Sequence, residues 1–172
     1  KMRYHEIGIM ILKITGAIAS IKPENPPIVN KITKAIENII GTSASETIKG
    51  DANVNKLEGI AGNDTLYGYA GNDTLEGGAG EDTLDGGTGT DEIDYSADAA
   101  AGGDAGVTVD LAVGTATDGF GAQDQLTNIE NITGTDQTDQ LTGSDAANVI
   151  QGNAGDDVIA GLGGADAIDG GV

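Results

Sequence analysis

The chain lacks cysteine and tryptophan, has a single histidine, and contains few aromatic residues, which make up 3% of its 172 residues. Without cysteine there can be no disulfide bridge, thiolate metal site or cysteine nucleophile. His5 cannot form a catalytic constellation alone, and the sequence contains no metalloprotease, serine-hydrolase or P-loop motif. The missing motifs lead us to expect no enzymatic activity. So few aromatic side chains cannot build an ordinary globular core, which favours disorder or a repeat architecture.

Basic residues are also scarce, and the net charge is −20. Six of the eight Lys and Arg residues lie in the first forty positions, and only Lys49 and Lys56 follow. A surface this acidic repels phosphate backbones and anionic lipids and attracts cations, so we expect no nucleic-acid partner and no membrane insertion. The apolar stretch 7–21 is too short to span a bilayer and contains Lys13, which favours a strand or the tail of an upstream region over a signal peptide.

Glycine is abundant, at 29 residues, and it recurs at a fixed interval. From Gly41 the sequence divides into nonapeptides such as GIAGNDTLY, GYAGNDTLE and GGAGEDTLD, each with glycine first and Ile or Leu eighth. The same frame returns at Gly134. The aliphatic residues at position eight are Ile48, Leu57, Leu66, Leu75, Leu84, Ile93, Leu141, Ile150, Ile159 and Ile168. Such a period is typical of a solenoid.

The repeats predict four segments: a basic, apolar N-terminal segment (1–40), a first repeat block (41–94), a connector (95–133) and a second block (134–172). In the connector, VTVDLAVGTA (107–116) alternates apolar and small or polar residues, which predicts a half-buried strand followed by a glycine turn. The related segments AIENIIGT and NIENITGT place Glu37 and Glu130 at position six, just before each block. Because the second block is the shorter one, we expect the chain to be part of a larger parent polypeptide.

A nine-residue period suits a turn of about six residues and a strand of about three, so that two units form one coil and equivalent residues stack about 4.8 Å apart. Each coil then buries only two aliphatic side chains, worth roughly 4–6 kcal/mol. Ordering the backbone costs roughly 1–2 kcal/mol per residue, so another interaction must stabilise each coil.

Position six indicates what that interaction is. It holds a carboxylate in most units: Asp64, Asp73, Asp82, Asp91, Asp139, Asp157 and Asp166. Stacked carboxylates repel one another unless a cation lies between them, and glycine-rich turns allow backbone carbonyl groups to point at such an ion. A flexible set of oxygen ligands suits Ca²⁺ better than Mg²⁺ or Zn²⁺.

These units resemble the RTX, or haemolysin-type, calcium-binding nonapeptide repeat. The resemblance implies an all-β, right-handed parallel β-roll, here in two blocks joined by a connector with a β-hairpin, which binds several Ca²⁺ ions in its turns. It also implies a bacterial protein that is exported unfolded by type I secretion and folds outside the cell or at its surface. The ligands it implies are the carboxylates of Asp64, Asp73, Asp82, Asp91, Asp157 and Asp166 and carbonyl groups around Gly59, Ala61, Gly68, Ala70, Gly77, Ala79, Gly86, Thr88, Gly152, Ala154, Gly161 and Gly163.

Three units depart from the pattern, with Glu46, Asn55 and Asn148 at position six. We expect weak or missing sites there, in coils that cap the roll.

Two functions fit the sequence. One is a non-catalytic module that folds on calcium and stabilises or presents a secreted protein. The other is a polysaccharide- or surface-binding module, similar to R-modules of alginate epimerases or to parts of S-layer and adhesin proteins. The scarcity of basic residues ranks the second lower for an anionic polymer. Tyr67, Tyr69 and Tyr95 could form a sugar platform, although Tyr67 and Tyr69 flank Gly68 and also fit outward-facing strand positions.

Overall fold

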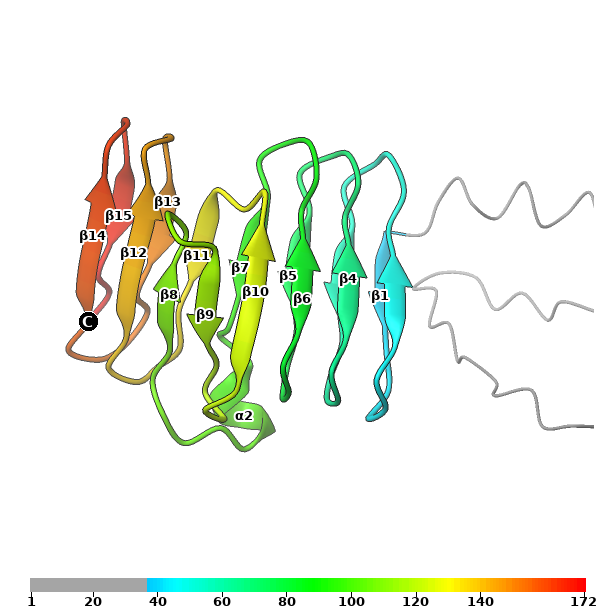
Figure 1. Ribbon diagram of the computed structural model, residues 1–172. Helices are drawn as coiled ribbons and strands as arrows, with labels where there is room; N and C mark the ends of the chain where they lie inside the picture. Colours follow the sequence, from blue (N-terminus) through cyan, green and yellow to red (C-terminus); the bar gives the residue numbers. More distant parts are fainter. Residues whose placement is uncertain (1–36) are drawn as a thin grey trace, which may run out of the picture.

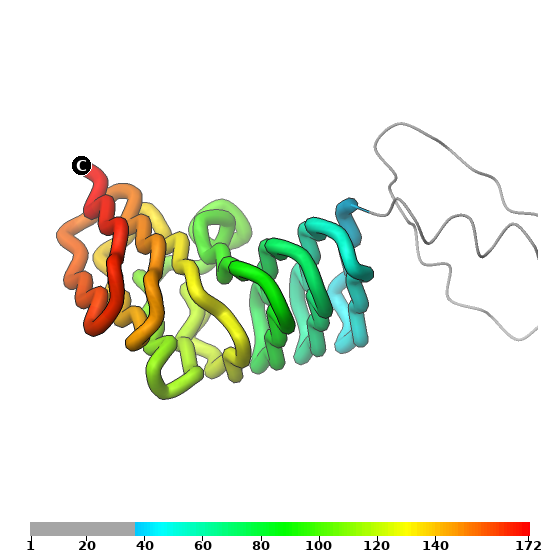
Figure 2. Tube along the Cα trace, turned by 90° about the horizontal axis from the view of Figure 1, so that it is seen from above, coloured from blue at the N-terminus to red at the C-terminus, as the bar shows by residue number. Residues whose placement is uncertain are grey.

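The structure is a computed structural model, and it describes residues 37–172. This part is a parallel β-solenoid of about seven turns, with one short helix, α2 (Asp98–Ala101). Its coils follow one another along a single axis (Figures 1 and 2). The predicted N-terminal segment lies outside the described residues except at its end, where Asn38–Ile40 forms β1. No helix among residues 37–172 is long and apolar enough to cross a membrane.

Two sheets face each other across the core. The first contains, in spatial order, β1 (Asn38–Ile40), β3 (Lys56–Glu58), β5 (Thr74–Glu76), β7 (Glu92–Asp94), β11 (Asn131–Thr133), β13 (Val149–Gln151) and β15 (Ala167–Asp169). The second contains β14 (Val158–Leu162), β12 (Gln140–Ser144), β8 (Thr108–Asp110), β9 (Thr115–Thr117), β10 (Gln123–Thr127), β6 (Thr83–Asp85), β4 (Thr65–Tyr67) and β2 (Thr47–Lys49).

Most position-eight residues form the core, as the nine-residue period predicts, but Ile159 is only partly buried and Ile168 in β15 is 51% exposed, because no further coil of the described residues covers them. Most strands are three residues long, and their middle side chain points inward while the flanking two point outward. Leu57 pairs in register with Leu75, and Leu66 pairs with Leu84; all four side chains are fully buried. The predicted all-β roll with stacked aliphatic residues is confirmed.

The connector contains the predicted hairpin. β8 and β9 pair antiparallel and are inserted into the second sheet between β12 and β10. In the first sheet β7 pairs directly with β11, so this sheet passes from one repeat block to the next without interruption. Tyr95 fills the core beside the insertion and donates a hydrogen bond from its hydroxyl to Oδ2 of Asp124 at 2.8 Å. Because it is fully buried, the suggestion that Tyr95 contributes to a sugar platform is wrong.

The strand predicted over 107–116 is shorter than expected. β8 ends at Asp110, and the backbone N–H of Gly114 donates to the carbonyl of Asp110 at 2.8 Å, which closes a turn. Val113 is therefore 71% exposed. Leu111 and Val113 continue the alternation of apolar residues although they lie in the turn, so the pattern alone does not show where the strand ends.

Candidate metal centre

The position-six carboxylates lie in the turns that connect the two sheets. Each uses one oxygen to join consecutive coils: the backbone N–H of Asp64 donates to Oδ1 of Asp82, and that of Asp73 donates to Oδ1 of Asp91, both at 2.7 Å. The partners are eighteen residues apart, as two nonapeptides per coil require. One carboxylate oxygen therefore takes part in a ladder that runs along the turns.

The second carboxylate oxygen is buried and accepts no hydrogen bond from the described residues in five of these turns. The five atoms are Oδ2 of Asp64, Asp73, Asp82, Asp91 and Asp157. Asp64, Asp73 and Asp82 are each only 1% exposed. A buried, unpaired anionic oxygen costs several kcal/mol, so each of these oxygens indicates a ligand.

The surroundings of these oxygens are rich in acceptors. A Cβ atom placed on Gly59 would overlap Oδ2 of Asp64 and would lie 2.5 Å from the carbonyl oxygen of Gly77 in the next coil. Gly68 has the same relation to Asp73 and Gly86. The absence of a side chain at position one thus leaves a small space faced by a carboxylate oxygen and a carbonyl oxygen. A hard cation fits this donor set.

Burial also perturbs the acid–base equilibria of these groups. It raises the pKa of Asp64, Asp73 and Asp91 above the ordinary value of 3.8. For Asp82, burial together with the neighbouring carboxylates raises the pKa to about 7. The metal-free fold thus disfavours the charge that a calcium site requires, and a bound cation would relieve this penalty.

In four other turns, the position-six side chain accepts a hydrogen bond from within its own unit. The backbone N–H of position two donates to the position-six side chain of the same unit: Thr135 to Oδ2 of Asp139 at 2.7 Å, Ser144 to Asn148 at 2.7 Å, Asp51 to Asn55 at 2.8 Å and Thr42 to Glu46 at 2.8 Å. Three of these four are the units that the sequence predicts to have weak or missing sites. In these four turns, which we call self-satisfied, the protein itself provides the hydrogen bond to the position-six oxygen, so no cation is needed there.

The backbone at position two separates the two kinds of turn. We call a buried Oδ2 atom without a hydrogen-bond partner among the described residues a bare oxygen. In the five turns that contain one, position two has a positive φ: 81° at Ile60, 76° at Tyr69, 82° at Gly78, 96° at Gly87 and 68° at Asn153. None of the self-satisfied turns has a positive φ at this position. We infer that this rotation directs the N–H of position two away from position six and leaves the oxygen bare.

Asp139 is the one predicted carboxylate whose turn is self-satisfied. Its Oδ1 accepts hydrogen bonds from the N–H of Val107 at 2.8 Å and the hydroxyl of Thr135 at 2.9 Å, while Oδ2 accepts from the N–H of Thr135. Asp166 belongs to the other kind of turn, since Leu162 at position two has a φ of 68°, and its Oδ1 accepts from the N–H of Asn148 at 3.0 Å.

The predicted carbonyl ligands also differ from one another. Position-one carbonyls lie beside the bare oxygens, as described for Gly77 and Gly86. At position three, the carbonyls of Ala79 and Thr88 accept hydrogen bonds from the N–H groups of Gly62 and Gly71 in the preceding coil. Position-one carbonyls are thus the better placed of the two sets.

Asp124 is a residue of these turns that the sequence analysis missed. Its Oδ1 accepts a hydrogen bond from the N–H of Asp82 at 3.0 Å, so that it occupies position six of the next coil. Burial raises its pKa to about 7. The segment GFGAQDQLT (119–127) has glycine first, Asp124 sixth and Leu126 eighth, but the shifted register of the connector conceals this unit. Glu130 is likewise in the predicted position six and accepts from the N–H of Asp91 at 2.8 Å.

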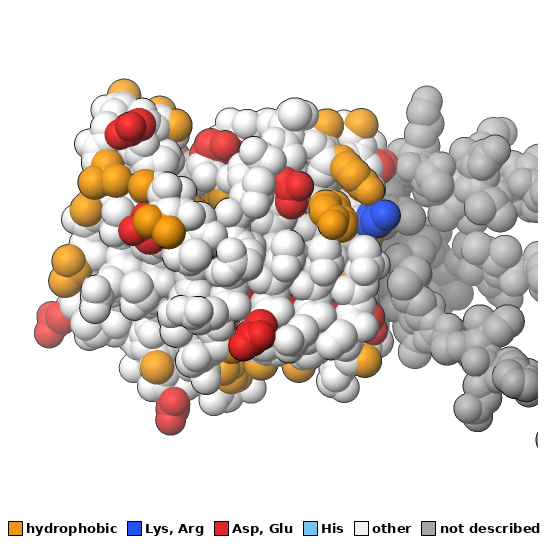
Figure 3. Space-filling view, in the orientation of Figure 1, with side chains coloured by type: hydrophobic (Ala, Val, Ile, Leu, Met, Phe, Trp, Pro, Cys, Tyr) orange, Lys and Arg blue, Asp and Glu red, His pale blue; other side chains and the backbone are white. Residues whose placement is uncertain are grey.

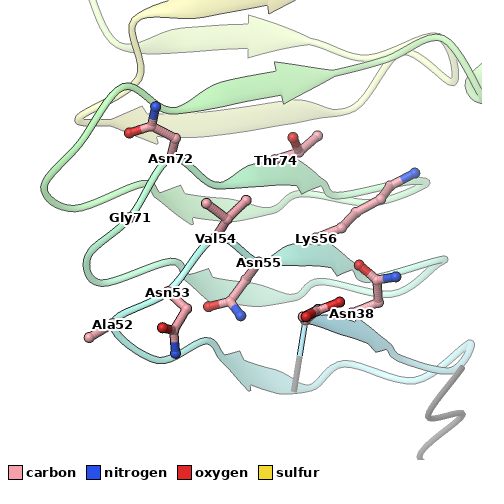
Figure 4. A pocket seen from close by; sticks show the side chains of 10 residues that line it. Asn38, Ala52, Asn53, Val54, Asn55, Lys56, Gly71, Asn72 and Thr74 are labelled. Atoms are coloured by element: carbon pink, nitrogen blue, oxygen red, sulfur yellow. The ribbon is translucent and has the colours of Figure 1, made fainter. Parts of the chain in front are cut away.

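The side chains of the described range form no multi-carboxylate metal site. No three His, Asp or Glu side chains among residues 37–172 converge as metal ligands, as expected if each turn supplies one carboxylate and its other ligands are backbone carbonyls. A surface hollow near β3 is lined by polar and apolar residues, among them Asn53, Asn72 and Lys56 (Figure 4). Lys56 is ion-paired with Glu58 at 3.1 Å and Glu76 at 3.2 Å.

Comparison with known proteins agrees with this geometry. The model of the RTX calcium-binding nonapeptide repeat matches residues 40–68, 58–93 and 142–172. No curated protein matches the chain significantly. The repeats of this family bind Ca²⁺ and form a structural rather than a catalytic module. With its nonapeptide period, β-roll and bare turn carboxylates, the chain belongs to the RTX calcium-binding repeat family.

Proposed function

We propose that this β-roll is a non-catalytic module that folds when it binds calcium outside the cell, and that it stabilises or presents a secreted or surface protein. The observation that carries the proposal is the set of five buried carboxylate oxygens without hydrogen-bond partners. In a calcium-poor cytosol these charges oppose folding, which keeps the chain in a form suited to export. In calcium-rich surroundings the ion compensates them, and binding energy becomes folding energy.

The proposed ligands are the carboxylates of Asp64, Asp73, Asp82, Asp91, Asp157 and Asp166, with carbonyl groups of the facing glycine turns. Bound calcium would supply positive charge beside the carboxylate oxygens that no donor of the described residues reaches. The aliphatic core then holds the coils in register, and the self-satisfied turns fold without an ion. For Asp139 the ligand role stays a prediction, and its complete set of hydrogen bonds favours a metal-independent turn.

The experiment is a calcium titration of the full chain followed by far-UV circular dichroism, with magnesium as the control. We expect a cooperative rise in β-structure that magnesium does not produce and a chelator reverses. A midpoint of about 10⁻⁴–10⁻³ M, the range of extracellular calcium modules, supports folding outside the cell. A chain that is fully folded in chelator contradicts calcium-coupled folding, and a midpoint near 10⁻⁷ M contradicts the extracellular part of the proposal.

A further inference from the structure

Tyr69 combines an exposed ring with a strained backbone. It stands at position two of its unit with a φ of 76°, and its side chain is 48% exposed. The next two units have glycine at this position, Gly78 and Gly87, with φ values of 82° and 96°. The repeat turn itself requires this φ, and glycine adopts it without the cost that an aromatic residue incurs, so the turn does not account for the ring of Tyr69.

The ring of Tyr69 stacks on the ring of Tyr67, which also lies beside Lys49. The ring centroids of Tyr67 and Tyr69 are 6.0 Å apart, and the planes differ by 16°. The ammonium group of Lys49 lies 5.7 Å from the centroid of Tyr67, and this lysine makes no ion pair with any residue of the 37–172 range. Tyr67 thus contacts Lys49 of β2 and the ring of Tyr69, and the two rings lie nearly parallel.

Polar groups flank this platform on the neighbouring strands. Tyr67 pairs in register with Lys49 on β2 and with Asp85 on β6, so that a donor and an acceptor lie one strand away on either side, about 10 Å apart. Oδ1 of Asp85 accepts a hydrogen bond from the side chain of Asn128 at 2.8 Å, which orients the carboxylate. On this face of the roll, hydrophobic side chains gather beside a basic one near the first coils (Figure 3).

A sugar ring has complementary chemistry. Its C–H face packs on an aromatic ring, and its hydroxyl groups both donate and accept hydrogen bonds, which suits one cation and one carboxylate at the rim. An anionic sugar fits less well, because Asp85 and the net charge of −20 repel it. We propose that Tyr69, backed by Tyr67 and flanked by Lys49 and Asp85, binds a sugar ring of an uncharged polysaccharide. This activity goes beyond calcium-coupled folding.

The test is isothermal titration of the full chain in saturating calcium with cello-, laminari-, malto- and mannohexaose, and with oligoalginate and oligogalacturonate as anionic comparators. We expect at least one neutral oligosaccharide to bind with a Kd of about 1 mM or tighter. The Tyr69→Gly variant introduces the residue of the next two units, so it removes the ring and relieves the strain. It should bind about tenfold more weakly or not at all while melting no lower than the original chain. Tyr69→Phe should retain most of the binding.

Ile60→Gly is the matched control. Ile60 occupies position two of the preceding unit with a φ of 81° and is 45% exposed, but it lies in a turn on the other side of the roll. This variant should relieve the same strain and leave sugar binding unchanged. The proposal is overturned if no neutral oligosaccharide binds, if Tyr69→Gly binds as well as the original chain, or if only the anionic sugars bind. Circular dichroism of each sample reports separately whether calcium has folded the roll.

Discussion

Replacing Asp82 with asparagine removes the charge of a bare carboxylate oxygen but nearly preserves its shape. The side chain is 1% exposed, its Oδ1 accepts the N–H of Asp64 at 2.7 Å, and its Oδ2 has no hydrogen-bond partner. An asparagine oxygen can keep the first bond. The second oxygen is lost, and with it a proposed calcium ligand. The substitution should therefore have opposite effects without and with calcium.

The magnitude in chelator follows from the raised pKa. A pKa of about 7 instead of 3.8 corresponds to roughly 4 kcal/mol of penalty on the ionised form at pH 8. Solvent screening reduces this gain, and the new amide N–H₂ group has no acceptor, which costs about 1–3 kcal/mol. We expect Asp82→Asn to stabilise the calcium-free fold by about 1–3 kcal/mol. In calcium at one hundred times its Kd, the loss of one site should cost about 3 kcal/mol.

The assay is thermal unfolding at pH 8 followed by circular dichroism, in chelator and in saturating calcium. If the chelated chain is unfolded at room temperature, all variants are compared at one concentration of trimethylamine N-oxide, which favours the folded state. Asp139→Asn is the control, because both oxygens of Asp139 already accept hydrogen bonds from the protein. It should destabilise the fold in both conditions. If Asp82→Asn also lowers the melting temperature in chelator, the reasoning about the bare oxygen is refuted.

Three further predictions concern pH, the glycine turns and the core. Burial raises the pKa values of Asp64, Asp73, Asp82 and Asp91 in the folded state, so their contribution to stability is complete below their ordinary pKa of 3.8 and is lost as the pH rises through the raised values, about 7 for Asp82. The chelated chain should thus unfold at higher urea at pH 5 than at pH 8, whereas calcium affinity, measured by titration, should fall at pH 5; equal urea midpoints would contradict this. Gly87→Ala should lower the free energy of unfolding in urea by more than about 3 kcal/mol, because a Cβ there would overlap the carbonyl oxygen of Tyr69. Gly102 also has a positive φ but lies in open space, so Gly102→Ala should cost only about 1 kcal/mol. Similar losses for the two variants would argue against the close approach of coils. Leu75→Ala should cost about 2–5 kcal/mol in saturating calcium, because its side chain is fully buried between Leu57 and Ile93, whereas Val158→Ala, at a position 65% exposed, should change the unfolding midpoint little.

The repeat region shows why the fold could be predicted so closely. A nine-residue period with an aliphatic residue at position eight allows few arrangements that bury every copy, and the register of Leu57 with Leu75 follows from that period alone. The connector could not be predicted in the same way. There the hairpin of β8 and β9 shifts the chain, and the unit with Asp124 at position six returns out of frame.

The sequence by itself determined the nonapeptide period, the position of each carboxylate at the end of a glycine turn, and the choice of a hard cation, because these depend on spacing and residue chemistry. Only the tertiary structure distinguished the turns from one another. Asp73 and Asp139 both occupy position six, yet one has a bare buried oxygen and the other accepts three hydrogen bonds. The difference lies at position two. Thr135 donates to Asp139 through its N–H and its hydroxyl. Tyr69, with a φ of 76°, makes no such bond to Asp73, and this backbone rotation could not be read from the repeat pattern.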